Sequence, residues 1–195
     1  MDDNSIRRVA ELLRERNAID TKIAQVTGRP VTAGHVGEWI ASQIFDIQLA
    51  ENAAAPGIDG WFRSGSLQGR SVNVKWYMKQ EGLLDIPQST DPDYYLVLTG
   101  PPALAGPSRD TTRPWRIESV YLFDAPRLRS EQEARGVEPG IASSVTKEQW
   151  LAAEIYPSTR HQTLMVTPGQ AVLLQQFCPV DVDVAAGTAA SRLST

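Results

Sequence analysis

The segment from Ala55 to Tyr77 constrains the fold most, because its pattern is typical of a β-hairpin. Residues 64–69 in its middle combine glycine and serine, which favour a tight turn. The returning residues alternate between apolar and polar, as a half-buried strand does. The apolar face comprises Val72, Val74 and Trp76. The opposite face therefore carries Asn73 and Lys75 together.

Two helices are predicted before this hairpin. The first covers residues 4–27, with Asn4 as a suitable N-cap and Gly28 as a stop signal. The second covers residues 32–49 and begins after Thr32, whose hydroxyl can accept from a backbone N–H of the first turn. The first helix shows two narrow apolar stripes, a pattern that suits packing across its own domain or on a partner chain.

Further elements follow the hairpin. The pattern predicts strands over residues 93–100, 115–123 and 163–166, and helices over residues 127–136, 146–156 and from 167 onward. Residues 101–114 form a proline-rich loop that we expect to be exposed.

This mixture predicts an α/β (α+β) fold with a mixed central sheet flanked by helices and preceded by a long N-terminal helix. We expect the N-terminal helix over residues 1–30, one domain over residues 31–183 and a flexible tail over residues 184–195.

Composition limits the function classes. Of 195 residues, 42% are hydrophobic and 22% are charged, which is typical of a globular protein. No apolar run is long enough to cross a membrane, and the first residues do not resemble a secretory signal. A single cysteine, Cys178, excludes an internal disulfide framework and a cysteine-rich zinc site. We therefore expect a cytoplasmic protein without a membrane segment.

The net charge argues against one class of nucleic-acid binder. The chain carries a formal charge of −4 and has an isoelectric point near 5.2. Proteins that hold nucleic acid avidly and without specificity are usually basic, because phosphate contacts supply most of that affinity. A nuclease that binds its substrate weakly remains compatible with this charge, because the local electrostatic field at the site determines binding there.

Four residues carry the candidate chemistry. Glu38 lies among small and apolar residues of the second helix, and Asp59 lies at the entry to the hairpin. Asn73 and Lys75 share one face of the returning strand. A helix acid, a strand acid, a hairpin and a polar-x-Lys strand, over residues 32–98, resemble the PD-(D/E)XK nuclease superfamily.

A second resemblance involves three short segments. Gly34–Glu38, Gly57–Gly60 and Val72–Tyr77 are also similar to an uncharacterised bacterial domain family. The superfamily resemblance implies a restriction-endonuclease-like fold and Mg²⁺-dependent hydrolysis of DNA, for example in restriction or defence.

The resemblance implies roles for the four residues. Asp59 matches the first metal-binding acid, Glu38 matches the additional helix acid, and Asn73 and Lys75 match the (D/E)-x-K element. Asn73 departs from the pattern, because its neutral oxygen can approach Mg²⁺ without supplying charge. Glu38 and Asp59 would then be the metal-binding carboxylates, and one or two carboxylates suffice for many Mg²⁺ sites. Lys75 would stabilise developing charge or position a water.

Lys75 and two neighbouring candidates, His35 and Asp85, also have structural interpretations. Lys75 can form a purely structural ion pair with Asp59 or Glu38. His35, one turn before Glu38, can support the site or be an ordinary surface or core histidine. Asp85 can be a further acid or the cap of a turn.

Nucleic-acid contacts are predicted around the hairpin. Arg63, Arg70 and Lys79 flank it and can contact phosphates, although a solvated rim would use the same residues. Trp76 can stack on a base, although packing in the core is the more usual role of tryptophan.

Three functions remain open from the sequence. The first is a Mg²⁺-dependent nuclease acting on DNA. The second is a catalytically inactive relative that binds nucleic acid or a protein partner. The third is an oligomeric interaction protein that forms a homodimer through the N-terminal helix.

Overall fold

The computed structural model describes residues 3–51, 57–87, 92–102, 113–158, 161 and 163–178. Its centre is a six-stranded sheet in the order β1-β2-β3-β5-β6-β8. These strands are β1 (Ile47–Leu49), β2 (Gly60–Phe62), β3 (Ser71–Tyr77), β5 (Tyr94–Thr99), β6 (Ser119–Asp124) and β8 (Glu154–Tyr156). A separate two-stranded sheet pairs β4 (Leu83–Leu84) with β7 (Ser143–Ser144).

The central sheet is mixed. Strands β3 and β5 run parallel, whereas the other neighbouring pairs are antiparallel. The register places Asn73 beside Tyr95 and Lys75 beside Val97. Asp93 supports this register at the start of both strands, because its Oδ2 accepts from the backbone nitrogen and the hydroxyl of Ser71, each at 2.8 Å.

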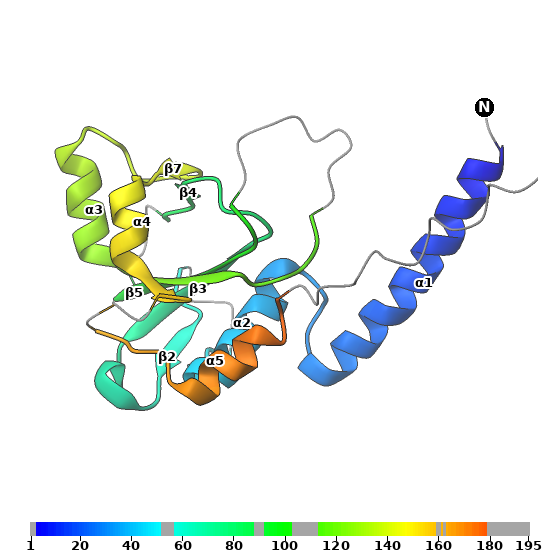
Figure 1. Ribbon diagram of the computed structural model, residues 1–195, viewed down its shortest axis with the longest axis horizontal. Coiled ribbons are helices and arrows are strands. Elements are labelled where there is room, and N and C mark those ends of the chain that lie inside the picture. The colour runs from blue at the N-terminus through cyan, green and yellow to red at the C-terminus, as the bar shows by residue number, and fades with distance from the viewer. Residues whose placement is uncertain are drawn as a thin grey trace, which may run out of the picture.

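Helices cover both faces of the sheet (Figure 1). The helices are α1 (Asp3–Thr27), α2 (Ala33–Phe45), α3 (Ala125–Ala134), α4 (Lys147–Ala153) and α5 (Pro168–Gln175), with a 3-10 turn at Gly65–Leu67. Helices α2 and α5 pack on one face, and α3 and α4 pack on the other. Helix α1 extends away from this three-layer body.

Alternation along the strands divides the core between the two faces. Val72, Val74 and Trp76 pack toward α2, together with apolar residues of β5 and β6. Tyr95 and Val97 point to the opposite face, where they pack toward α3 and α4. The predicted apolar face of the hairpin strand is therefore confirmed.

Most predicted elements are present. The mixed α/β fold, the long N-terminal helix, the hairpin and the strands around residues 94–99 and 119–124 are confirmed. Thr32 caps α2 as predicted, and Thr146 forms the predicted capping box of α4. Helix α1 begins at Asp3, so Asn4 is a helical residue and not the N-cap.

Three secondary-structure predictions were wrong. Residues 47–49 are a strand, because Asp46 adopts a left-handed conformation (φ 54°) that ends α2. Residues 154–156 form edge strand β8 instead of continuing α4. Residues 163–166 are not a strand. Most of the loop at 101–114 and the whole tail at 184–195 lie outside the described residues.

Two glycines allow neighbouring elements to pack closely. A Cβ at Gly37 would lie 2.9 Å from Cβ of Trp76, so the glycine lets α2 approach β3. A Cβ at Gly60 would overlap the carbonyl oxygen of Gln48 on β1. Within the described residues, no helix has the length and apolar character needed to cross a membrane.

Candidate functional site

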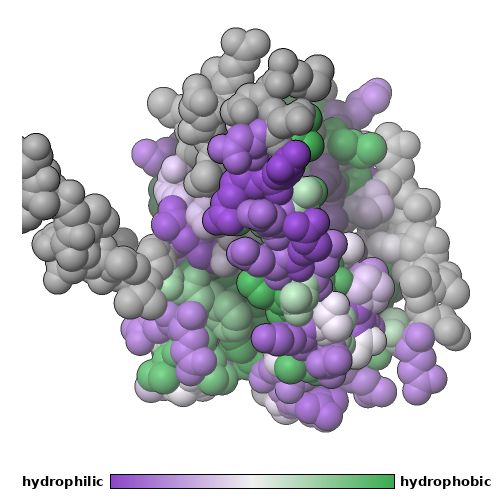
Figure 2. Space-filling view, turned by 90° about the vertical axis from the view of Figure 1, so that its right-hand side faces the viewer, coloured by the Kyte–Doolittle hydropathy of each residue, from purple (hydrophilic) through white to green (hydrophobic). Residues whose placement is uncertain are grey.

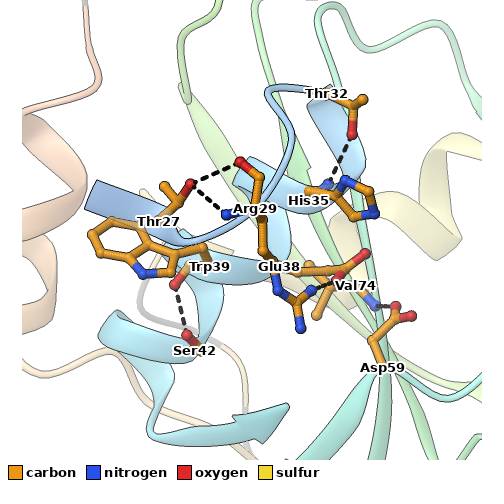
Figure 3. A network of polar contacts seen from close by, with 9 residues as sticks. All are labelled: Thr27, Arg29, Thr32, His35, Glu38, Trp39, Ser42, Asp59 and Val74. Carbon is orange, nitrogen blue, oxygen red and sulfur yellow. Dashed lines mark hydrogen bonds and ion pairs between the residues drawn. The ribbon is translucent and has the colours of Figure 1, made fainter. Parts of the chain in front are cut away.

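The candidate site lies where α2, the start of β2 and strand β3 meet. Helix α2 contributes Glu38, the residue before β2 is Asp59, and β3 contributes Asn73 and Lys75. Figure 3 shows Glu38 and Asp59 directed toward a common space, with the guanidinium of Arg29 beside them.

Backbone hydrogen bonds fix the position of Asp59. Its Oδ2 accepts from the backbone nitrogen of Val74 at 2.7 Å, and its own nitrogen donates to the carbonyl of Val72 at 2.9 Å. The carboxylate is thus held against β3 at the residue between Asn73 and Lys75. Burial raises the pKa of Asp59, while the Val74 hydrogen bond and the charge of Lys75 oppose that rise.

Glu38 is paired with a residue that the sequence did not suggest. Arg29, in the connection between α1 and α2, donates from Nη1 to Oε2 of Glu38. Both side chains are mostly buried, with 17% of Glu38 and 29% of Arg29 exposed. Burial raises the pKa of Glu38, repulsion from Asp59 adds to the rise, and Arg29 and His35 oppose it.

Lys75 is partly buried and lies within electrostatic reach of Asp85 and Asp59. Burial lowers its pKa, while the negative charges of Asp85 and Asp59 favour the ammonium form. Its Nζ lies 5.8 Å from the ring centroid of Tyr95. In the described part of the chain, no salt bridge within hydrogen-bonding distance joins Lys75 to Asp59 or Glu38, so the direct structural ion pair is not formed.

Asn73 presents a buried oxygen. Only 7% of the residue is exposed, and its Oδ1 has no hydrogen-bond partner among the described residues. A buried amide oxygen without a partner costs free energy, because water no longer solvates it. Coordination to a cation is one way to satisfy it.

Asp85 takes part in the same network through β4 and its flanking loop. Its Oδ1 accepts from the backbone nitrogen of Ala142 at 2.8 Å, and its Oδ2 accepts from the hydroxyl of Tyr77 at 3.2 Å. Asp85 therefore anchors local backbone, as its interpretation as a cap suggests, and also acts electrostatically on Lys75.

The predicted phosphate-contact residues are each paired with a carboxylate. Arg63 donates from Nε to Oδ1 of Asp46 at 2.7 Å, and Arg70 donates from Nη1 to Oδ1 of Asp93 at 3.0 Å. Lys79 pairs with Glu81. Their positive charges are thus partly neutralised within the protein.

The structure corrects the expectation that Trp76 can contact nucleic acid. Its side chain is buried between α2 and the sheet, and its ring packs edge-on against Trp115 at 5.5 Å. Its indole N–H donates to the carbonyl of Arg116 at 3.3 Å. The alternative interpretation, core packing, describes this residue.

The donor set fits a metal ion that retains several waters. Glu38 and Asp59 supply two carboxylates, and Mg²⁺ commonly uses one or two together with water and phosphate oxygens. Asn73 on β3 carries a further buried oxygen, Oδ1, without a partner among the described residues. Within the described residues, no group of three or more histidine, cysteine, aspartate or glutamate side chains could enclose a metal.

Sequence reasoning missed Arg29 entirely and gave Asp85 little weight. Arg29 is nine positions before Glu38 and lies in the connection before α2, outside that helix, so helical spacing could not indicate their contact. The available signal was indirect: a nearly apolar helix face carrying Glu38 requires a cation from outside that helix. Asp85 approaches Lys75 only because β4 folds back.

Comparison of the chain with family models and with curated proteins finds no match.

Proposed function

We propose that this chain hydrolyses phosphodiester bonds of DNA with Mg²⁺ at a PD-(D/E)XK-like site in the cytoplasm. The observation that carries the proposal is the convergence of Glu38 and Asp59 from separate elements, with Lys75 acting electrostatically on Asp59. Two desolvated carboxylates repel one another, and a divalent cation relieves that repulsion. The resemblance of residues 32–98 to the nuclease superfamily supports the same assignment.

The residues would divide the work as follows. Glu38 and Asp59 would hold the ion, with Asn73 contributing a neutral oxygen. When bound, Mg²⁺ supplies a Lewis acid for a phosphate oxygen and lowers the pKa of a bound water. Lys75, held as a cation by Asp85 and Asp59, stabilises the negative charge that develops on the phosphate. The Val74 N–H keeps Asp59 in position.

One observation favours a second function, a catalytically inactive protein that binds nucleic acid or a protein partner. The guanidinium of Arg29 already neutralises Glu38, and Asn73 supplies no charge. In that case Arg29, Glu38, Asp59 and Lys75 form a structural charge network. The two functions differ in one measurable property, which is metal-dependent cleavage.

A cleavage assay tests the proposal. Purified protein is incubated with supercoiled and linear DNA in MgCl₂ or MnCl₂, with EDTA as the metal-free control. We expect wild-type cleavage and a loss of at least about a hundredfold for Lys75→Met, because a preorganised charge-stabilising group is removed. Lys147→Met changes an exposed lysine at the start of α4 and should cleave like wild type.

The fold of each variant is checked by circular dichroism. Replacing Lys75 removes a buried charge and leaves an apolar chain of similar length, so folding should be retained. Absence of wild-type cleavage with either metal, or wild-type rates in a folded Lys75→Met variant, would contradict the proposal.

A further inference from the structure

Helix α1 carries apolar surface that its own chain leaves uncovered. The helix has 25 residues and extends away from the body. Six large apolar side chains on it are between 46% and 70% exposed: Ile6, Val9, Leu12, Leu13, Ile19 and Val26. Figure 2 looks at the molecule from the side of α1 and shows mainly hydrophilic residues in the foreground, with hydrophobic surface around and below them. Most helices gain their stability by packing such a face, so this one requires a partner.

The spacing of these residues identifies the partner as another helix. Val9, Leu12, Arg16, Ile19, Ile23 and Val26 follow one another at alternating intervals of three and four residues. This is the a/d repeat of a two-stranded coiled coil, in which each side chain inserts between side chains of a facing helix. Arg16 is the single polar member. Ile23 is already partly buried against the body, at the end where α1 joins it.

The charges indicate a second copy of the same helix in antiparallel orientation. In a parallel pair Arg16 would face the partner's Arg16 in the middle of the apolar seam, and like charges there are unfavourable. In an antiparallel pair centred between residues 17 and 18, Val9 faces the partner's Val26, and Arg16 faces the partner's Ile19. The partner's Asp20 then lies next to Arg16.

Contacts within α1 already prepare this arrangement. Arg16 Nε lies 3.5 Å from Oδ2 of Asp20 in the same helix, so each copy presents a guanidinium and a carboxylate at the centre of the seam. The antiparallel register also brings Glu15 close to the partner's Lys22, and the two-fold axis repeats this pair. Arg16 and Glu15 at the centre of the seam thereby each lie close to an opposite charge of the partner, and such flanking charges commonly set orientation in coiled coils.

We propose that α1 forms a homodimer by antiparallel pairing of two copies along the stripe Val9, Leu12, Arg16, Ile19, Ile23 and Val26. This inference is independent of the nuclease proposal, because none of these residues belongs to the candidate site. It assigns the projecting helix a binding partner of defined chemistry: an identical helix with complementary central charges.

Oligomeric state tests the pairing. Light scattering coupled to size-exclusion chromatography should show a dimer for the wild-type chain. The double variant Leu12→Asp, Ile19→Asp should weaken dimerisation by at least about a hundredfold, because two central apolar contacts are replaced by charges. Leu151→Asp alters a leucine of α4 that is 62% exposed and should remain dimeric. A monomeric wild-type chain, or a dimeric double variant, would overturn the proposal.

Cross-linking tests the orientation. In a Cys178→Ser background, chains with Val9→Cys are mixed with chains with Val26→Cys under oxidising conditions. The antiparallel arrangement predicts efficient disulfide formation between the two different chains and little formation within either single population. Preferential linkage of Val9→Cys chains to one another would instead show a parallel pair and overturn the orientation.

Discussion

At the scale of single residues, the charge balance around Glu38 sets the properties of the site. Two cations, Arg29 and Lys75, lie among the three carboxylates of Glu38, Asp59 and Asp85. Burial raises the pKa of Glu38 and Asp59 and lowers that of Lys75, because it makes the charged form of each group less favourable than in water. Arg29 is the residue that chiefly keeps Glu38 ionised.

Replacing Arg29 with glutamine should therefore raise the pKa of Glu38 further, because an adjacent positive charge is removed. The pKa is measured from the side-chain carboxyl ¹³C shift as a function of pH. Arg127→Gln, which disrupts an exposed Arg–Glu pair of α3, is the control and should leave Glu38 unchanged.

The same substitution changes how stability depends on pH. A carboxyl whose folded pKa exceeds its unfolded value loses stabilisation as pH rises between the two values. Arg29→Gln should make that loss of stability larger as pH rises above the unperturbed glutamate pKa of roughly 4.3. A Glu38 pKa that is equal in wild type and in Arg29→Gln would show that the ion pair does not control this carboxylate.

At the scale of elements, the contact between α2 and β3 positions the site. Gly37 faces Trp76 so closely that the helix lies directly on the strand, and the next residue, Glu38, is thereby brought near Asp59. The helix ends at Phe45, because Asp46 turns the chain back into β1.

Two glycines of α2 provide a matched pair of substitutions. A methyl group at Gly37 would lie 2.9 Å from Cβ of Trp76, whereas at Gly34 its nearest neighbour is Oε1 of Glu38 at 3.9 Å. Overpacking costs about 1–3 kcal/mol, and alanine gains about 0.5–1 kcal/mol over glycine within a helix. Gly37→Ala should therefore lower the free energy of unfolding by about 1–2 kcal/mol, and Gly34→Ala should raise it by about 0.5–1 kcal/mol.

Urea denaturation followed by circular dichroism gives both values. Equal effects of the two substitutions would mean that α2 can move away from β3 without loss, and the close approach would then have no role in placing Glu38.

Local patterns account for the elements that sequence alone predicted. The alternation of residues 70–77 and the capping box at Thr146 depend on neighbouring residues, so the sequence displays them directly. The strand at Ile47 was missed because an apolar residue there satisfies a helix face as well as a strand. Its strand state depends on pairing with β2, a contact between distant segments.

The candidate site divides in the same way. The common face of Asn73 and Lys75 follows from strand geometry, and the structure preserves it. The placement of Asp59 against Val74 follows from the hairpin pairing. The contact between Arg29 and Glu38 could not be predicted, because it depends on how the connection between α1 and α2 folds in the tertiary structure.

At the scale of the whole molecule, the proposed nuclease function has to work against an unfavourable overall charge. The chain carries a formal charge of −4, so its long-range field does not attract DNA. Arg63, Arg70 and Lys79 are each paired with a carboxylate and offset this only in part. A bound divalent ion would add positive charge where a phosphate has to approach.

Metal binding is therefore the property on which the proposed function depends. A titration of Mn²⁺ followed by electron paramagnetic resonance distinguishes bound from free ion. We expect wild type to bind the ion, and Asp59→Asn to bind it at least about tenfold more weakly, because the amide keeps the Val74 hydrogen bond but removes the charge. Glu133→Gln, an exposed substitution on α3, should bind like wild type. A free-ion spectrum throughout the wild-type titration, or equal affinity in Asp59→Asn, would contradict a metal site at Glu38 and Asp59.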